Sequence, residues 1–400
     1  MQTLGSDICF VNINFTGSLL AFAIQSTGNQ ATIVLPSTLN WKFEPEITAY
    51  YPVSVNQFLT SYSNIRFIEK LSALFPNLVY PVRILTFNSS EKIKAKTIEA
   101  FDILLKRDRD HASLPLNPAN FEQLKHLSEN LHSGALAFEH RFDRNMATIE
   151  LIKLCKQKGA RIICEDEYKR SESDANKTIF CQSNDYKSNE IIIKSFDTNF
   201  KNDLRIISDK IEIQIQKNCN DTIFRFNSNN RTNIQNIREH CGQMLSSIGI
   251  QNIEPIMTEF GHVNLSKSAN KITDQQNNNV LEDLPISFLP TNYPLIEKQV
   301  SKLIGKKIDL KKPLNRLKNA KVTASSFRQY QNECDEKFDL AKQTGVPYQK
   351  FQYLFYRYYN EIDNFIEKAY EQMNKTRDAE FIWQKIEEEY QTSIIQELLS

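Results

Sequence analysis

The stretch that decides the fold is "DICFVNINFTGSLLAFAIQSTGNQATIVLP", from Asp7 to Pro36. Its residues Ile8–Val11 form a short apolar run, which is typical of a buried strand, and "NINFTG" after it predicts a tight turn. Ser18–Gln25 then predict a helix, and Ala31–Leu35 predict a second buried strand. A strand, a helix and a second strand at this spacing indicate the start of a layered α/β protein with a parallel sheet.

The turn carries a degenerate form of the G-x-G-x-x-G fingerprint of dinucleotide-binding folds. The three glycines would fall on positions 12, 14 and 17, but the chain has Asn12 and Asn14 there, and only Gly17 remains, preceded by Thr16. The first glycine takes a strained backbone conformation, the second admits the pyrophosphate, and the third allows close helix packing. Asn12 tolerates left-handed geometry. Asn14 is expected to point its side chain at the pyrophosphate position.

The composition excludes several classes of function. The chain has 400 residues, of which 49 are basic and 48 acidic, so its charge gives no reason to expect nucleic acid as a partner. Seven cysteines without a C-x-x-C pair indicate reduced thiols, and the histidines have no metal-ligand spacing, so no metal is expected. No export signal or membrane-spanning run is visible, which predicts a cytoplasmic protein without a transmembrane segment and leaves peripheral membrane contact open.

The middle of the chain mixes two kinds of strand signal. Residues 145–158 predict a helix that ends at Gly159, followed by the strand "ARIICE" at 160–165. By contrast, "KIEIQIQKN" (210–218) and "DTIFRFNSNN" (221–230) alternate apolar with polar residues, as in a half-solvated antiparallel hairpin. We therefore expect a nucleotide-type sheet with an inserted second sheet.

The remaining segments suggest a boundary near residue 320. "KSANKITDQQNNN" (267–279) is polar and unpatterned, which predicts a loop. From about Ser325 the pattern is purely helical, and one apolar stripe typical of a core face consists of Phe351, Leu354, Phe355, Tyr358, Ile362, Phe365, Ile366 and Ala369. We predict a discontinuous nucleotide-binding and substrate domain over 1–319 and a C-terminal α-helical domain over 320–400.

Several stretches resemble the FAD-dependent glycerol-3-phosphate dehydrogenases. They are "DICFVNINFTG" (7–17), "FIEKLSALFPNLVYPVRILTF" (67–87), "SGALAFEHRFDRNMATIELIKLCKQKGARI" (133–162) and "YPLIEKQVSKLIGKKIDLKKP" (293–313). The resemblance implies an α/β fold: a Rossmann-like FAD/NAD(P)-binding domain with an inserted mixed or antiparallel substrate sheet, and a C-terminal α-helical domain. It also implies FAD as cofactor and oxidation of glycerol 3-phosphate to dihydroxyacetone phosphate, with a quinone as electron acceptor.

The cofactor positions that the resemblance implies are partly lost. Leu35 stands where the family has an acidic residue for the ribose hydroxyls, so a charge-assisted hydrogen bond of about 1.5–3 kcal/mol is missing. In the family's late flavin turn, Thr291 and Tyr293 survive, whereas Leu289 replaces a lysine. The strand that the family ends in an alanine-threonine-glycine-proline turn ends here in "KSFDTNF", around Asp197.

The substrate positions are also altered. Asn56 lies near the place of one substrate arginine, and His262 is the nearest polar substitute for the other. A phosphate monoester is usually held by Arg or Lys, and neither expected arginine is present. These independent losses favour a descendant that has lost flavin and catalysis, has no assigned catalytic residue, and serves as a binding or scaffold protein for a protein partner or a small ligand. The alternative is an active flavoprotein oxidoreductase that uses FAD.

One charged stretch allows a further interpretation. "AFEHRFDRN" brings together Glu139, His140, Arg141, Asp143 and Arg144 before a helix, which is a composition that acid/base chemistry uses. The pattern favours instead a solvated strand end whose last polar residues cap the helix.

Overall fold

The structure is a computed structural model. It describes residues 8–36, 39, 41, 45–48, 67–74, 79–88, 114–116, 133–170, 177–182, 189–194, 203–208, 211–218, 221–228, 234–259, 273–275, 278–283, 289–309, 313, 324–376 and 378–400. Among these residues no helix is long and apolar enough to cross a membrane.

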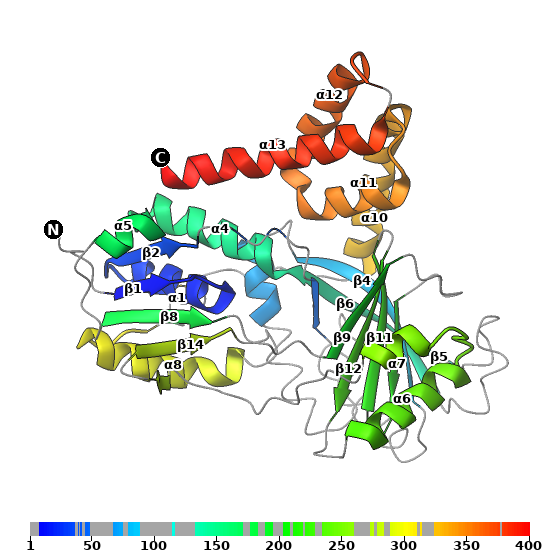
Figure 1. Ribbon diagram of the computed structural model, residues 1–400, viewed down its shortest axis with the longest axis horizontal. Coiled ribbons are helices and arrows are strands. Elements are labelled where there is room, and N and C mark those ends of the chain that lie inside the picture. Colours follow the sequence, from blue (N-terminus) through cyan, green and yellow to red (C-terminus); the bar gives the residue numbers. More distant parts are fainter. Residues whose placement is uncertain are drawn as a thin grey trace.

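The first sheet has the doubly wound order of nucleotide-binding proteins (Figure 1). Its parallel strands are β1 (Ile8–Val11), β2 (Ala31–Leu35), β7 (Arg161–Cys164), β8 (Thr178–Gln182) and β14 (Asn278–Glu282). They lie in the order β14-β8-β1-β2-β7, with β13 (Thr273–Gln275) antiparallel at the β14 edge. The strand order therefore reverses between β1 and β8, which is the topological switch point of this fold.

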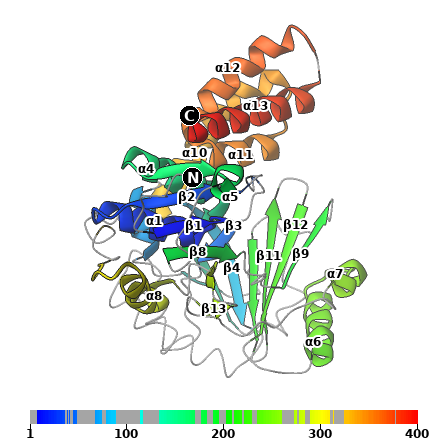
Figure 2. The ribbon, with the colours of Figure 1, turned by 60° about the vertical axis from the view of Figure 1, so that its left-hand side comes forward.

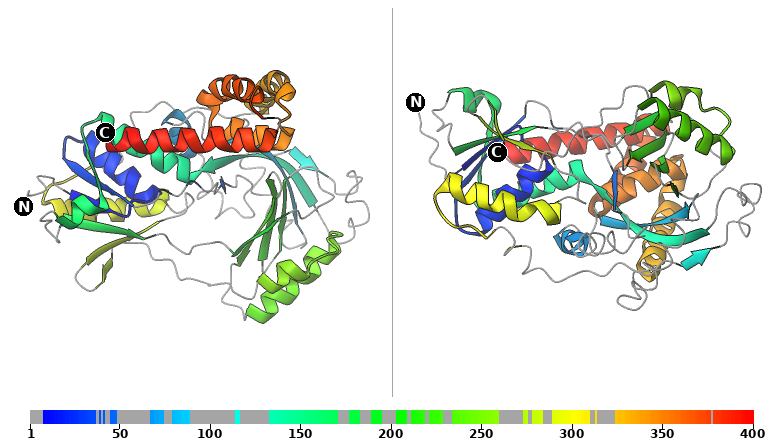
Figure 3. Two further views of the ribbon diagram at one scale, coloured as in Figure 1. Left: turned by 45° about the horizontal axis from the view of Figure 1, so that its top comes forward. Right: turned by 90° about the horizontal axis from the view of Figure 1, so that it is seen from below.

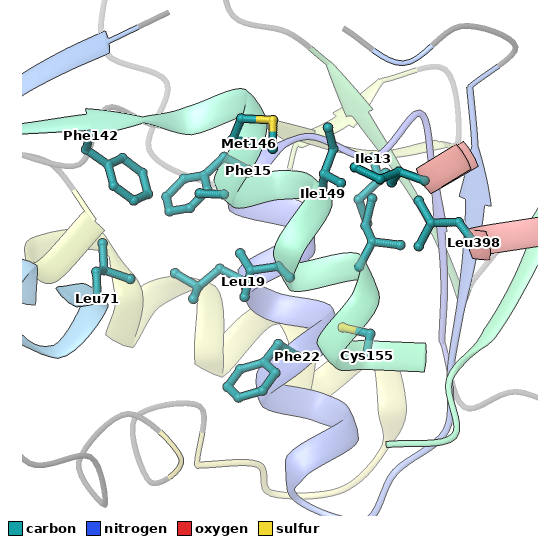
Figure 4. Close-up of a cluster of buried hydrophobic side chains, with 14 of the residues drawn as sticks. Ile13, Phe15, Leu19, Phe22, Leu71, Phe142, Met146, Ile149, Cys155 and Leu398 are labelled. Atoms are coloured by element: carbon teal, nitrogen blue, oxygen red, sulfur yellow. The ribbon is translucent and has the colours of Figure 1, made fainter. Parts of the chain in front are cut away.

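Two helices pack side by side on one face of this sheet (Figure 4). They are α1 (Phe15–Ser26) and α4 (Arg144–Gln157), and Leu19 and Phe22 of α1 face Cys155 of α4 in a buried cluster. Gly159 has a positive φ of 87° just after α4, as a helix C-cap requires. The strand-helix-strand units predicted from the sequence are thus confirmed, with helix α1 beginning three residues earlier than expected.

The second sheet is mixed and has its own core. Its order is β3-β6-β4-β10-β11-β12-β9, and the strands are β3 (Pro45–Thr48), β4 (Val79–Asn88), β6 (Ser133–Asp143), β9 (Asn189–Lys194), β10 (Asp203–Ile207), β11 (Ile211–Asn218) and β12 (Asp221–Ser228), with β5 (Leu114–Leu116) paired to β6. Helix α6 (Ile234–Ser247) packs on one face, on the side away from the first sheet (Figure 2), and α7 (Glu254–Glu259) follows it. This is the inserted sheet that the sequence predicted.

Two expectations for this half of the chain are wrong. The β11–β12 hairpin is not half-solvated: Gln216 and Arg225 are 1% and 7% exposed, and Arg225 donates a hydrogen bond of 2.9 Å to Gln216 Oε1. Arg225 is thus bonded to a side chain of the neighbouring strand, as buried polar groups usually are. The stretch 267–279 is not entirely a loop, because 273–275 form β13 and β14 begins at Asn278.

The C-terminal part is helical, as predicted. It contains α10 (Ala324–Ala341), α11 (Tyr348–Arg357), α12 (Ile362–Met373) and α13 (Ala379–Leu399), and every member of the predicted apolar stripe is buried. Helix α13 runs back along α4 (Figure 3), where Lys156 Nζ donates a 2.6 Å hydrogen bond to the carbonyl of Glu397. The helices and the first sheet share one hydrophobic cluster. The boundary at residue 320 stays a prediction.

Candidate nucleotide-binding turn

The β1–α1 turn lies at the edge where a ligand of this fold would bind. Because β1, β8 and β14 are parallel, their carboxyl ends meet at one edge of the sheet. The strand order reverses between β1 and β8, and open α/β sheets bind their ligands in the crevice at that point.

The two asparagines of the turn play different roles. Asn12 has a φ of 55°, so it takes the left-handed conformation that the sequence predicted for it. Asn14 is the N-cap of α1, and its Oδ1 accepts a hydrogen bond of 2.8 Å from the Gly17 amide. Its Nδ2 donates to the carbonyl of Gln182, the last residue of β8, at 3.0 Å. The Asn14 side chain therefore bridges the crevice between β1 and β8.

A carboxylate from the segment after strand β14 contacts the same turn. Asp283 follows β14, and its Oδ1 accepts hydrogen bonds from the Thr16 amide at 3.0 Å and the Thr16 hydroxyl at 2.8 Å. The guanidinium of Arg144, the first residue of α4, lies 2.7 Å from the same oxygen. The Asp283 amide in turn donates to the Gln182 carbonyl at 3.0 Å. A chain of bonds thus closes the amino end of α1.

Gly17 has the packing role that the third glycine of the fingerprint usually has. A Cβ atom at this position would lie 2.5 Å from Sγ of Cys181 in β8, which is far inside van der Waals contact. Helix α1 can therefore approach β8 this closely only with glycine at position 17.

Leu35 offers nothing to a ribose. It is the last residue of β2, pairs with Cys164 of β7, and is 4% exposed within the hydrophobic core. A side chain of this kind in this place has no acceptor for sugar hydroxyls.

Of the other predicted site residues, the structure describes only the two in the late flavin turn. Thr291 and Tyr293 lie in the first two turns of α8 (Leu289–Ile304), where Tyr293 is 2% exposed in the core. Burial and the nearby charge of Glu297 raise the pKa of Tyr293 above its ordinary value. Asn56 and His262 lie outside the described residues.

The charged stretch before α4 is the end of strand β6, and its side chains are described from Arg141 onward. Asp143 caps α4 through a 3.2 Å bond from the Met146 amide, as expected, but it is buried and not solvated. Arg141 pairs with Asp203 of β10, whereas Arg144 pairs with Asp283. The arginines of the stretch whose side chains are described therefore pair with different partners.

No protein-family model matches the chain, and a search of curated proteins finds no match. Among solved structures it is similar to the glycerol-3-phosphate dehydrogenase from Bacillus halodurans complexed with FAD, with a TM-score of 0.50 and 12% identity over 95% of this chain and 81% of that chain. The fold is that of a FAD-dependent oxidoreductase. L-amino acid deaminase from Proteus vulgaris (TM-score 0.43, 13% identity, 78% of this chain and 94% of that chain) and L-proline dehydrogenase from P. horikoshii (0.45, 12%, 78% and 96%) are also similar.

The residues of the turn do not fit the cofactor that this fold implies. In the flavoprotein fold, the amides at the start of the first helix face the pyrophosphate. Here the Thr16 amide already donates to Asp283, and the Gly17 amide already donates to Asn14. The carboxylate of Asp283 therefore lies where a negatively charged pyrophosphate would have to bind. The place for the ribose contact holds Leu35. At these two places the described residues therefore do not offer the free donors and the acceptor that the adenosine diphosphate half of FAD uses in this fold.

Sequence reasoning missed two residues of this network, Gln182 and Asp283, and it also missed the role of Arg144. Gln182 ends β8, Asp283 follows β14 and Arg144 begins α4, but neither β8 nor β14 was predicted from the sequence, so the ends of these strands gave no signal. What the sequence did not show is that these ends meet, since Thr16 and Asp283 are 267 positions apart.

Proposed function

We propose that this chain is a divergent homologue of FAD-dependent glycerol-3-phosphate dehydrogenase that works without flavin, as a binding or scaffold protein. One observation carries the proposal: the donors at the amino end of α1, which a pyrophosphate needs, are engaged by the chain's own Asn14 and Asp283. The fold alone supports the relationship to the dehydrogenase. The loss of flavin and of catalysis is the proposed part.

The energetics of the turn support the absence of flavin. Hydrogen bonds to a charged group contribute about 1.5–3 kcal/mol each, and an entering pyrophosphate would have to break those of Asp283. It would also meet the negative charge of that carboxylate in a partly shielded place, since the Asp283 side chain is 20% exposed. Like charges brought together in this way are disfavoured.

The proposed occupant of the scaffold is a protein partner or a small ligand other than FAD. Nucleic acid is not proposed, because the charges of the chain balance. The described cysteines are all free thiols, which supports a reducing compartment, and a cytoplasmic location is part of the proposal.

The visible spectrum of the purified protein tests the proposal. We expect a colourless preparation that releases no flavin on denaturation and shows no saturable heat with added FAD in calorimetry. The protein should not reduce an artificial electron-accepting dye when glycerol 3-phosphate is added. A yellow protein that releases a stoichiometric amount of FAD would overturn the proposal and support the alternative, an active flavoprotein.

A triple variant tests whether the turn is the only defect. Asn12→Gly, Asn14→Gly and Leu35→Glu together restore the local requirements of the fingerprint but leave Asp283 in place. We expect at most weak ADP binding by calorimetry and no dye reduction, with circular dichroism as the control for folding. Substrate turnover by this variant would show that the rest of the site is intact.

A further inference from the structure

The carboxylate of Asp283 has the surroundings that a bound anion would have. Three donors converge on its Oδ1: the Thr16 amide at 3.0 Å, the Thr16 hydroxyl at 2.8 Å and the Arg144 guanidinium at 2.7 Å. The amide belongs to the first turn of a twelve-residue helix, whose amino end carries partial positive charge. Backbone amide, hydroxyl and guanidinium are the donors that proteins use for phosphate.

We propose that Asp283 is a built-in replacement for a phosphate ligand. Its carboxylate occupies the anion position of the first turn and keeps the site closed, and without it the same donors bind inorganic phosphate. The inference rests on the proposed function, because it explains how the fold remains stable with no nucleotide in the turn.

The position of Asp283 is set by the backbone, not by its side chain alone. β14 pairs with β8 in parallel register, with Glu282 opposite Gln182, so the next residue leaves the sheet at the edge where α1 begins. The Asp283 amide is held by the Gln182 carbonyl at 3.0 Å. The same carbonyl accepts from Asn14, so carboxylate and turn share an anchor.

Arg144 is held in place independently of the carboxylate. Its guanidinium carbon lies 5.1 Å from the ring centroid of Phe15, the first residue of α1, and its side chain is 14% exposed. This ring in turn packs edge-on against Phe142 with 5.1 Å between centroids. Loss of Asp283 therefore removes a negative partner from the shielded guanidinium of Arg144 at the amino end of α1, and a bound anion would replace it.

An ordinary stabilising ion pair predicts a different outcome. If Asp283 only stabilised the junction of α1 and α4, its removal would lower stability and leave no preference among anions. A ligand replacement predicts that a multivalent oxyanion restores the lost stability at a saturable site.

The test compares Asp283→Ala with wild-type protein and with Asp339→Ala, which removes an exposed carboxylate paired with Lys342. Thermal melts and calorimetry are run with sodium phosphate and with sodium chloride at equal ionic strength. We expect Asp283→Ala to melt lower in chloride and to regain stability saturably in phosphate, with phosphate binding at least about tenfold tighter than to wild type. Wild type and Asp339→Ala should respond equally to the two salts.

A second variant covers the case in which Asp283→Ala does not fold. Asp283→Ser places a shorter polar side chain at this position and still opens room for an anion, and it should show the same phosphate response. If the folded variants respond to phosphate no more than Asp339→Ala does, the inference is wrong. A flavin-loaded wild type would overturn the proposed function instead, and its spectrum reports that separately.

Discussion

At the scale of single residues, helix packing requires glycine at position 17 of the first turn, whereas only a bound ligand would require it at position 14. Gly17 remains because the approach of α1 to Cys181 leaves no room for a side chain. Asn14 stands where only a bound pyrophosphate would require glycine, and there it caps the helix instead. The turn therefore keeps the residue that the fold needs.

Gly17→Ala tests the packing demand directly. We expect a loss of roughly 1–3 kcal/mol in the free energy of unfolding, because overpacking forces α1 away from β8. Denaturant titration measures it, and Cys181→Ala in the same chain should recover part of the loss by removing the Sγ atom 2.5 Å from the new Cβ. Gly242→Ala is the control, since its Cβ would have ordinary contacts of 3.6 and 3.9 Å. Equal stability of Gly17→Ala and wild type would contradict the close packing.

At the scale of elements, the helices of the C-terminal part dock through an aromatic face. The ring of Phe355 is completely buried and lies edge-on to Tyr330 at 5.4 Å. Helix α13 then continues along α4, which covers the first sheet. Phe355 and the residues of that sheet belong to one hydrophobic cluster, so the helical part and the sheet share a core.

Phe355→Ala should lower the free energy of unfolding by about 3–5 kcal/mol, since it leaves a large cavity in a packed core. The measurement is chemical denaturation followed by circular dichroism. Phe381→Ala provides the control, because that ring is 54% exposed and its loss should change stability little. An unchanged unfolding curve for Phe355→Ala would show that the stripe is not a core.

A buried ion pair fastens α11 to the start of α4. The Nε of Arg357 lies 3.1 Å from Asp143 Oδ2, with side chains 2% and 1% exposed, and Glu387 of α13 lies 3.7 Å from the guanidinium. Burial alone would lower the pKa of Arg357, but the charge of Asp143 and the other nearby acidic groups raises it above its ordinary value. The guanidinium therefore stays charged.

Arg357→Met should cost about 3–5 kcal/mol of stability, because it removes a buried positive charge that pairs with the buried carboxylate of Asp143. Lys342→Met removes an ion pair whose side chains are 56% and 70% exposed, and it should cost no more than about 1 kcal/mol. Both values come from denaturant titrations at neutral pH. Comparable losses in the two variants would mean that the buried pair has no special role.

At the scale of the whole molecule, buried thiols link stability to alkaline pH. Burial raises the pKa of Cys9 to about 12, against 9.0 for an ordinary cysteine, and Cys155 behaves in the same way. Because the folded values lie above the unfolded one, this contribution to stability is complete below pH 9.0 and is lost as pH rises toward 12.

We therefore expect the free energy of unfolding to decline above about pH 9. In native protein at neutral pH, a thiol reagent should leave Cys9 and Cys155 unmodified and react with the partly exposed Cys164. Mass spectrometry of digested protein identifies the modified positions, and unfolded protein is the positive control. Rapid labelling of Cys9 in the native state would contradict its burial.

The sequence predicted local structure well and long-range polar contacts poorly. The β1–α1–β2 unit and the apolar stripe of the C-terminal helices follow from hydrophobic periodicity, which depends only on neighbours in the chain. The β11–β12 hairpin was predicted as half-solvated, because alternation of polar and apolar residues does not reveal that Arg225 and Gln216 form a hydrogen bond in a buried part of the sheet. The loss at Leu35 was visible from its apolar character, but the closing of the turn was not.

The sequence by itself determined the β1–α1–β2 unit, helix α4 with strand β7, the β11–β12 hairpin and the C-terminal helical stripe. It also showed the loss of two glycines and an acidic residue from a nucleotide-binding pattern. Only the tertiary structure decided what replaces them. Thr16 and Asp283 are brought together because β1 and β14 run parallel and end at a common edge, although the two residues are 267 positions apart. Arg144 reaches the same point from the first residue of α4, which follows a strand of the second sheet. Hydrogen bonds and ion pairs act over a few ångströms in space, whatever the separation along the chain, so a pattern of neighbours does not encode them.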